Sequence, residues 1–298
     1  SGGLYAGVKL MVASIIFPAL IPAGVSGYQP AGALMFDDSG TDYLSDSSWG
    51  THSDSTKFSL SCWIKRTSLG KTAICTSGPD VNNQTIMQFD ANDKLDFMLY
   101  VNPNIGRLTS TAQFRDLTAW ANFVFVHDSS NGTANDKMRM YVNGARVTAL
   151  GTNTTPSGNY NKMTVNSANT VIGYDLISTA DVMDGYIADV VFLDGVASTD
   201  ASEFGETDSG TGIWVPKDPS TISSFGTNGF WLDFSNGSDI GNDVSGNNND
   251  FTPSSMGANN IAVDGPANST DKEVTIYSSF DPLQSGSGTL SNNNLTVS

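Results

Sequence analysis

Short segments of alternating apolar and polar residues, each bounded by turn-forming residues, recur along this chain. Residues 58–66 (FSLSCWIKR) place Phe58, Leu60, Cys62 and Ile64 on one face. Successive side chains of a β-strand point to opposite faces, so this spacing predicts a strand with one buried face. Segments with the helical period of 3.6 residues are nearly absent. The pattern indicates an all-β protein.

Turn signals join several of these segments into hairpins. Residues 85–101 predict two strands linked by the turn ANDK, and Asn143-Gly144 separates two further strand-like runs. Asn-Gly is a preferred dipeptide of type I′ turns. Continuous apolar runs at residues 122–128 and 186–195 predict strands that are buried on both faces. Many short strands separated by turns predict a two-sheet antiparallel sandwich.

Acidic residues outnumber basic residues in this chain. Its 298 residues include 14 Lys and Arg against 30 Asp and Glu, which gives a net charge of -16. Binding to nucleic acid needs basic side chains that neutralise phosphates, and binding to anionic lipid needs basic residues as well. The charge balance therefore predicts that neither nucleic acid nor a membrane is a partner.

Residues 1–30 contain the most apolar stretch of the sequence. Residues 10–23 (LMVASIIFPALIPA) are nearly all apolar, but a bilayer-spanning helix needs about 20 such residues, and Pro18 and Pro22 interrupt any helix. We expect an anchoring arm that packs on a partner surface, with a neighbouring subunit preferred over the chain's own domain. A signal peptide with Lys9 as its basic end is the alternative.

Strand and turn patterns divide the remaining sequence into two parts. Residues 31–215 hold most of the strand-like segments and predict the sandwich itself. Residues 216–298 are rich in Gly, Asn, Ser and Pro, and they predict a loop-rich β extension. Because residues 287–298 (SGTLSNNNLTVS) again resemble a strand, we expect the extension to lead toward a further domain.

The cysteine content constrains the redox chemistry only weakly. The chain has two cysteines, Cys62 and Cys75, which is too few for a disulfide framework or a metal cluster. Free buried thiols are the preferred expectation, because Cys is among the most frequently buried residue types. A single bridge between neighbouring strands is the alternative.

The order of several segments resembles laminin G-like (LamG) domains of the concanavalin A type. The strand FSLSCWIKRTSLG, the hairpin MYVNGARV and the strand DGYIADVVFLDG follow one another as in that family. The segments that carry the resemblance are residues 33–45, 58–70, 120–128, 140–147, 171–176 and 184–195. The resemblance covers residues 31–215 and implies an all-β, two-sheet antiparallel jelly-roll sandwich.

The sequence after this region resembles structural proteins of tailed bacteriophages. The stretches concerned are residues 204–217, 224–236, 243–252 and 263–269. In those proteins a segment similar to residues 287–298 often leads into a SPRY-like β-sandwich. The resemblance implies the N-terminal part of a tail fibre, a tailspike or a capsid fibre.

The same resemblance implies a structural role on the surface of a phage particle. We expect a homo-oligomer, such as a trimer, whose arm contacts a tail adaptor or the major capsid protein and whose sandwich faces host-surface glycans. One alternative is a capsid decoration or head-fibre protein that reinforces the shell. Another is a secreted carbohydrate-binding module. A sandwich fold hosts many functions and does not decide among them.

The residue pattern of glycoside hydrolysis is missing from the sequence. Related laminarinase-type glucanases use a Glu-x-Asp-x-Glu strand, and retaining enzymes need two carboxylates about 5 Å apart. The closest segment, residues 186–193, contains only Asp189, and no Gly-x-Ser-x-Gly motif accompanies His52 or His127. We therefore expect no catalytic residues, no cofactor-binding residues and no enzymatic activity.

The resemblance makes calcium the candidate metal, because LamG-like relatives hold Ca²⁺ on loop oxygens. Such hard cations take about six to eight oxygen ligands. Asp and Asn are also common in turns, where they bond to nearby backbone, and we expect turn chemistry first and a bound Ca²⁺ as the alternative. The candidate ligands are Asp37, Asp38 and Asp42 in one loop and Asp181 and Asp184 in another, and residues 243–250 form a third oxygen-rich loop.

Overall fold

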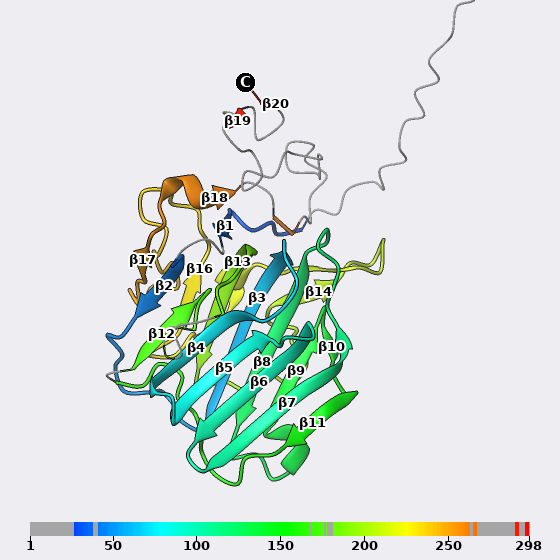
Figure 1. Cartoon of the computed structure of the whole chain (residues 1–298), viewed down its shortest axis with the longest axis vertical. Coiled ribbons are helices and arrows are strands. Elements are labelled where there is room, and N and C mark those ends of the chain that lie inside the picture. Colours follow the sequence, from blue (N-terminus) through cyan, green and yellow to red (C-terminus); the bar gives the residue numbers. More distant parts are fainter. Residues whose placement is uncertain are drawn as a thin grey trace, which may run out of the picture.

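Two antiparallel sheets face each other across a hydrophobic core in the computed structural model (Figure 1). The structure describes residues 27–37, 41–166, 168–175, 177, 181–262, 265–266, 290–291 and 296–297. The expected all-β jelly-roll sandwich is confirmed. The apolar stretch at residues 10–23 and most of the expected arm lie outside the described residues. Among the described residues, no helix has the length and apolar character of a membrane span.

Sheet A forms one layer of the sandwich, and all the strand pairs described in it are antiparallel. Its strands are, in order, β10 (Ala145–Arg146), β9 (Met138–Val142), β8 (Ala121–Asp128), β3 (Lys57–Arg66), β13 (Gly185–Asp194), β1 (Ala33–Phe36) and β18 (Ile261–Ala262), with β16 (Phe230–Leu232) paired to β13.

Sheet B forms the other layer and is antiparallel throughout its described pairs. Its strands are, in order, β11 (Leu150–Thr154), β7 (Asn104–Gln113), β6 (Lys94–Val101), β5 (Asn83–Phe89), β4 (Thr72–Asp80), β12 (Asn169–Ile172), β2 (Tyr43–Asp46) and β17 (Thr252–Ser254). The other elements are the pair β14 (Gly205–Thr207) and β15 (Trp214–Pro216), the pair β19 (Leu290–Ser291) and β20 (Thr296–Val297), and the 3₁₀ turns η1 (Ala134–Asp136), η2 (Pro219–Thr221) and η3 (Ala258–Asn260).

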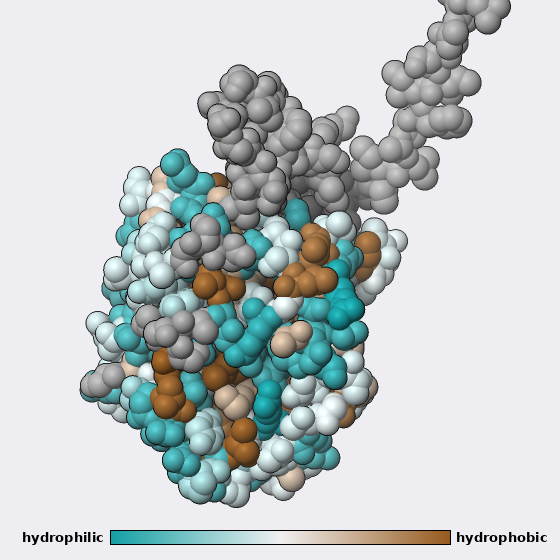
Figure 2. All heavy atoms as spheres, viewed as in Figure 1, coloured by the Kyte–Doolittle hydropathy of each residue, from teal (hydrophilic) through white to brown (hydrophobic). Residues whose placement is uncertain are grey.

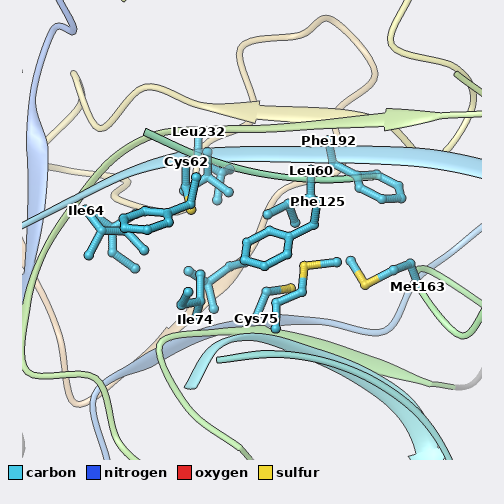
Figure 3. Packing of buried hydrophobic residues seen from close by; sticks show 14 of the residues in the cluster. Leu60, Cys62, Ile64, Ile74, Cys75, Phe125, Met163, Phe192 and Leu232 are labelled. Carbon is cyan, nitrogen blue, oxygen red and sulfur yellow. The ribbon is translucent and has the colours of Figure 1, made fainter. Parts of the chain in front are cut away.

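The side chains of β3 show why the alternation predicts a sandwich. Phe58, Leu60, Cys62 and Ile64 all lie in the core, each at most 2% exposed. Figure 3 shows residues of β3, β4, β8 and β13 meeting between the sheets. Cys62 and Cys75 are both buried and free, as preferred from the sequence. Each large apolar side chain buried here stabilises the fold by about 1.5–3 kcal/mol.

The predicted hairpin turns are present in the structure. Asn143 and Gly144 join β9 to β10 with φ values of 47° and 75°. Positive φ at both central positions is what a type I′ turn requires, and Asn and Gly tolerate it. Strands β5 and β6 pair from Asn83↔Val101 to Phe89↔Leu95, which confirms the hairpin expected around the ANDK turn.

The chain that follows β13 covers the outer face of sheet A. Phe204 and Phe225 pack with Val124 and Val191 in a second apolar cluster outside that sheet. Trp214 lies so close to the Gly144 backbone that a Cβ at Gly144 would stand 2.4 Å from the indole ring. The outer face of sheet A is therefore occupied by the protein's own chain.

Part of the expected extension belongs to the sandwich. Strands β16 and β18 join sheet A, β17 joins sheet B, and Phe230 and Phe251 lie in the main core. The division of the chain at residues 30 and 215 stays a prediction. The described residues from Lys217 to Ala262 contribute strands to both layers and do not form a separate extension.

Candidate functional site

The structure brings the two predicted calcium loops to the same end of the sandwich. Phe36 pairs with Gly185, so Asp37 and Asp184 flank adjacent positions of neighbouring strands. Asp42 is buried, and burial raises the pKa of its carboxyl, while a hydrogen bond from the Asp37 backbone opposes that rise. Asp38 lies outside the described residues.

The described carboxylates of these loops already have protein partners. Asp181 is bound to the Lys71 ammonium, and Asp184 accepts a hydrogen bond of 2.6 Å from the Thr67 hydroxyl. No group of three or more His, Cys, Asp or Glu side chains within the described part of the chain is arranged to hold a metal ion. In the third oxygen-rich loop, Asp243 accepts hydrogen bonds from the Ser245 and Asn249 amides, which is turn chemistry. Bound Ca²⁺ stays a prediction.

Asp189, the carboxylate of the strand closest to a glucanase motif, is a buried structural acid. It lies in a bulge of β13 with φ 43° and is 4% exposed. The Tyr28 hydroxyl and the Trp231 indole donate to its Oδ1 at 3.0 and 2.9 Å. Burial raises the pKa of Asp189 to about 7. Both donors hold the same oxygen inside the protein, so the carboxyl does not open toward a substrate.

His127 contributes a pH-dependent term to stability. It is fully buried beside Phe58, and burial lowers its pKa from 6.5 to about 4. Between these two pH values the unfolded chain binds the proton more strongly, so stability is lost as pH falls through the window. We expect this residue to account for a loss of at most about 3 kcal/mol between neutral pH and pH about 4.5. Urea unfolding at both pH values measures it.

His127→Gln serves as the comparison, because the amide does not titrate. Asp189 acts with the opposite sign: its raised pKa makes its contribution decline as pH rises from 3.8 toward about 7. The difference between wild type and His127→Gln therefore isolates the histidine. Equal pH slopes for the two proteins contradict the prediction.

Three neighbouring strands, β5, β6 and β7, present alternate residues on the outer face of sheet B. Their other residues, such as Met87, Phe97 and Leu108, lie in the core. Cross-strand pairing places the outward residues in three rows. We call these nine residues the sheet B patch: Gln88, Asp96 and Thr109; Ile86, Met98 and Arg107; Gln84, Tyr100 and Ile105.

Asp96 is the fixed centre of one row of the patch. It is fully buried, and it accepts hydrogen bonds from Gln88 Nε2 at 2.9 Å and from Thr109 Oγ1 at 2.7 Å. Arg107 donates to both carboxylate oxygens at 2.8 and 3.0 Å. This bidentate pairing raises the pKa of Arg107. The network holds the Gln88 and Arg107 side chains in one orientation.

Two amide oxygens of the patch have no partner among the described residues. Gln84 Oε1 and Gln88 Oε1 are buried and unbonded, whereas the two Nε2 atoms donate to Val81 O and to Asp96. Buried polar atoms nearly always have a hydrogen-bond partner. Gln84 and Gln88 stand on the same side of β5, and their backbone positions are about 13 Å apart along the strand. The patch therefore contains two enclosed acceptors, and a ligand's hydrogen-bond donors reach them only when neighbouring side chains move aside.

Apolar surface lies beside these acceptors. Tyr100 and Met98 are half-buried, and Ile105 is 36% exposed. Figure 2, viewed from the side of sheet B, shows separate apolar spots among polar residues rather than one continuous apolar area. Such a mixed face suits a ligand with hydroxyl groups next to apolar ring surface.

The sequence contained the patch residues without marking them as a site. Gln84, Gln88 and Asp96 stand at the outward positions of alternating strands, where polar residues ordinarily face water. The alternation indicates their face, but their burial and the unbonded oxygens depend on neighbouring strands and loops.

The family of the chain follows from comparison of its sequence with family models. A model described as the concanavalin A-like lectin/glucanases superfamily matches residues 38–201, more than half of the chain. The chain belongs to this superfamily. Membership of this superfamily agrees with the two-sheet fold. It also agrees with the resemblance of the strand segments to LamG domains. A comparison with curated proteins finds no match.

Three solved structures are similar to this chain at low sequence identity. A candidate carbohydrate-binding protein from Bacteroides ovatus has 17% identity and a TM-score of 0.50, covering 77% of this chain and 61% of its own. A pentraxin from Limulus polyphemus has 17% identity and a TM-score of 0.40 over 57% of this chain and 79% of its own. Tailspike protein 2 of the Escherichia coli O157:H7 bacteriophage CAB120 has 15% identity and a TM-score of 0.40 over 59% and 24%. These likenesses concern the fold.

Proposed function

We propose that this chain is a non-enzymatic structural protein of a tailed phage that binds host-surface carbohydrate through the sheet B patch. The observation that carries the binding proposal is the pair of buried, unbonded amide oxygens of Gln84 and Gln88 on the outer face of a lectin-like sandwich.

The chemistry of the patch favours a neutral saccharide. Sugar hydroxyls donate to amide oxygens, and the apolar face of a sugar ring packs on an aromatic ring such as Tyr100. The positive charge of Arg107 is paired with the Asp96 carboxylate. The chain as a whole carries a net charge of -16. Both facts disfavour a strongly anionic ligand such as nucleic acid.

The virion role is supported by the segments that resemble tailed-phage proteins. Residues 204–217 and 224–236 pack on or pair with sheet A, so these segments are integral to the sandwich. We propose that several copies act together on the particle surface, because linked weak sites raise effective affinity without new contacts. The arm then contacts a tail adaptor or the major capsid protein.

The double variant Gln84→Ala/Tyr100→Ala tests the binding site. These residues face each other across β5 and β6, so the variant removes one acceptor and the neighbouring ring. We expect glycans that bind the wild-type chain on a glycan array to bind at least about tenfold more weakly, as for the loss of about 1.4 kcal/mol.

Ile213→Ala is the matched control for this experiment. Ile213 is 62% exposed and lies next to β15, on the side of sheet A. We expect its glycan binding to equal that of the wild type. Unchanged binding in the double variant, or no glycan bound by the wild type, refutes the proposed binding function.

Electron microscopy with an antibody against the sandwich tests the virion role separately. We expect labelled phage particles, with label on the tail for an attachment protein. Label on the capsid supports shell decoration instead, and glycan binding by a protein absent from particles supports a secreted carbohydrate-binding module.

A further inference from the structure

Residues 27–32 join the sandwich to the part of the chain that precedes it. Tyr28 is half-buried, and Gly32 is buried. A Cβ at Gly32 would stand 2.5 Å from the carbonyl oxygen of Phe234, so this backbone lies directly on the segment that follows β16. Strand β1 then starts at Ala33 in sheet A. The position of residues 27–32 therefore determines where the preceding chain leaves the sandwich.

A hydrogen bond connects this segment to β13, 161 positions later in the chain. The Tyr28 hydroxyl donates to Asp189 Oδ1 at 3.0 Å, and the Trp231 indole donates to the same oxygen at 2.9 Å. Trp231 packs against the apolar cluster on the outer face of sheet A. The three side chains come from three separate segments of the chain. Their contact therefore fastens residues 27–32 to the outer face of sheet A.

The surroundings of the Asp189 carboxyl disfavour its charged form. Asp189 is 4% exposed, and its Oδ2 is buried without a hydrogen-bond partner among the described residues. Asp233 and Asp218 act on it through their charges, and both are acidic. Burial and like charge each oppose ionisation, and burial, the larger cause, raises the pKa of Asp189 to about 7.

Other charged side chains on the neighbouring segments have partners of their own. Lys65 on β3 lies over the ring of Tyr186 at 5.6 Å, and Lys217 donates to a backbone carbonyl at 3.0 Å. Asp243 accepts a hydrogen bond of 2.9 Å from a backbone amide of β16. None of the salt bridges between described residues includes Asp189. A negative charge on Asp189 is therefore stabilised mainly by its two hydrogen-bond donors.

We propose that Tyr28, Asp189 and Trp231 form a proton-sensitive latch, which holds residues 27–32 on sheet A while Asp189 is neutral and loosens when this carboxyl ionises. Release of Tyr28 gives water access to Asp189, and water stabilises the charged carboxylate. The held state therefore binds the proton more tightly than the released state, so rising pH weakens the latch. The latch determines how firmly the preceding chain is fixed to the sandwich. It goes beyond the proposed function and does not depend on binding at the sheet B patch.

Cleavage of the full chain by chymotrypsin after Tyr28 measures the released fraction, because a protease cuts this site only when the segment is free. A peptide of residues 22–34 corrects for the pH dependence of the protease itself. Below the held-state pKa of about 7, each pH unit changes the ratio of held to released chain by at most about tenfold. From pH about 5.5 to about 8.5 we therefore expect the corrected cleavage to rise by about fivefold to thirtyfold. Cleavage after Phe97, which is fully buried in the core, reports global unfolding and is expected to stay undetected.

Asp189→Asn removes the ionisation and keeps the hydrogen-bond acceptor. Asparagine tolerates the φ of 43° at this position and still accepts at Oδ1, so we expect corrected cleavage after Tyr28 that no longer changes with pH. The indole N–H signal of Trp231 in NMR spectra of the ¹⁵N-labelled chain, identified by its disappearance in Trp231→Phe, gives a second readout. We expect this signal to titrate near pH about 7 in the wild type and to stay constant in Asp189→Asn.

Asp116→Asn is the matched control, because it removes an exposed carboxylate that is bonded within its own turn. We expect this variant to keep the pH response of the wild type. Wild-type cleavage after Tyr28 that does not rise with pH overturns the latch, even if the Trp231 signal titrates, and leaves Asp189 a role in fold stability alone. An equal rise in Asp189→Asn overturns the latch as well.

Discussion

Replacing Asp93 with alanine is expected to lower the free energy of unfolding by about 3–5 kcal/mol, the usual cost of breaking a buried ion pair. Asp93 and Arg66 are each 3% exposed, and their side chains bond at 3.1 Å. Asp93 also accepts from Gly70 N and Arg115 Nε at 2.7 and 2.9 Å. Without the carboxylate, the Arg66 charge stays buried and poorly compensated. Urea unfolding measures the loss.

Two further variants separate charge from backbone conformation at this position. Asp93 has a φ of 62°, a left-handed conformation that Asn tolerates better than Ala. Asp93→Asn is therefore expected to be less destabilising than Asp93→Ala. Asp116→Ala, which removes a carboxylate bonded only within its own exposed turn, is expected to change stability far less. Equal losses for Asp93→Ala and Asp116→Ala contradict the buried ion pair as the cause.

Replacing Phe58 with alanine is expected to lower the free energy of unfolding by about 3–5 kcal/mol, because truncation of a buried Phe leaves a cavity. Phe58 is fully buried, and its ring contacts Phe97 of sheet B and Phe192 of sheet A at centroid distances of 6.1 and 5.8 Å. The side chain therefore joins the two layers, and the cavity opens where they meet. Urea denaturation curves of both proteins, fitted with one shared dependence of the free energy of unfolding on urea concentration, measure the change.

The exposed residue Leu69 supplies the control for this core substitution. It is 49% exposed, so Leu69→Ala is expected to change stability by no more than about 0.5 kcal/mol. Phe58→Leu fills part of the space and is expected to lie between the two. A loss below about 1 kcal/mol in Phe58→Ala contradicts a close-packed core at this position.

Much of the fold could be predicted from local patterns in the sequence. The alternation in β3 indicated which residues enter the core, and Asn143-Gly144 indicated the turn between β9 and β10. The sequence did not predict that the C-terminal segment contributes strands to the sandwich. Strand β16 has only three residues among many turn residues, and its place beside β13 depends on partners 38 to 42 positions earlier in the chain.

The polar side chains that the fold brings together could not be predicted from local sequence segments. His52 and Asp194 are 142 positions apart, and neither carries a motif that indicates the other. Gln84 and Gln88 stand where a solvent-facing glutamine is ordinary, and only the packed structure shows that their oxygens are buried without partners. The five predicted calcium ligands were chosen because they cluster in two loops, and two of the described ones, Asp181 and Asp184, are bonded to Lys71 and Thr67.

The sequence by itself determined the all-β class, the inward face of each long strand and the tight turns, because these follow from the two-residue period of a strand and from the φ angles that Asn and Gly tolerate. The tertiary structure decided which polar atoms are enclosed and left unbonded. That outcome depends on how loops from distant parts of the chain close over the sheet ends, and burial of a polar group is set by all of its neighbours together rather than by its own segment.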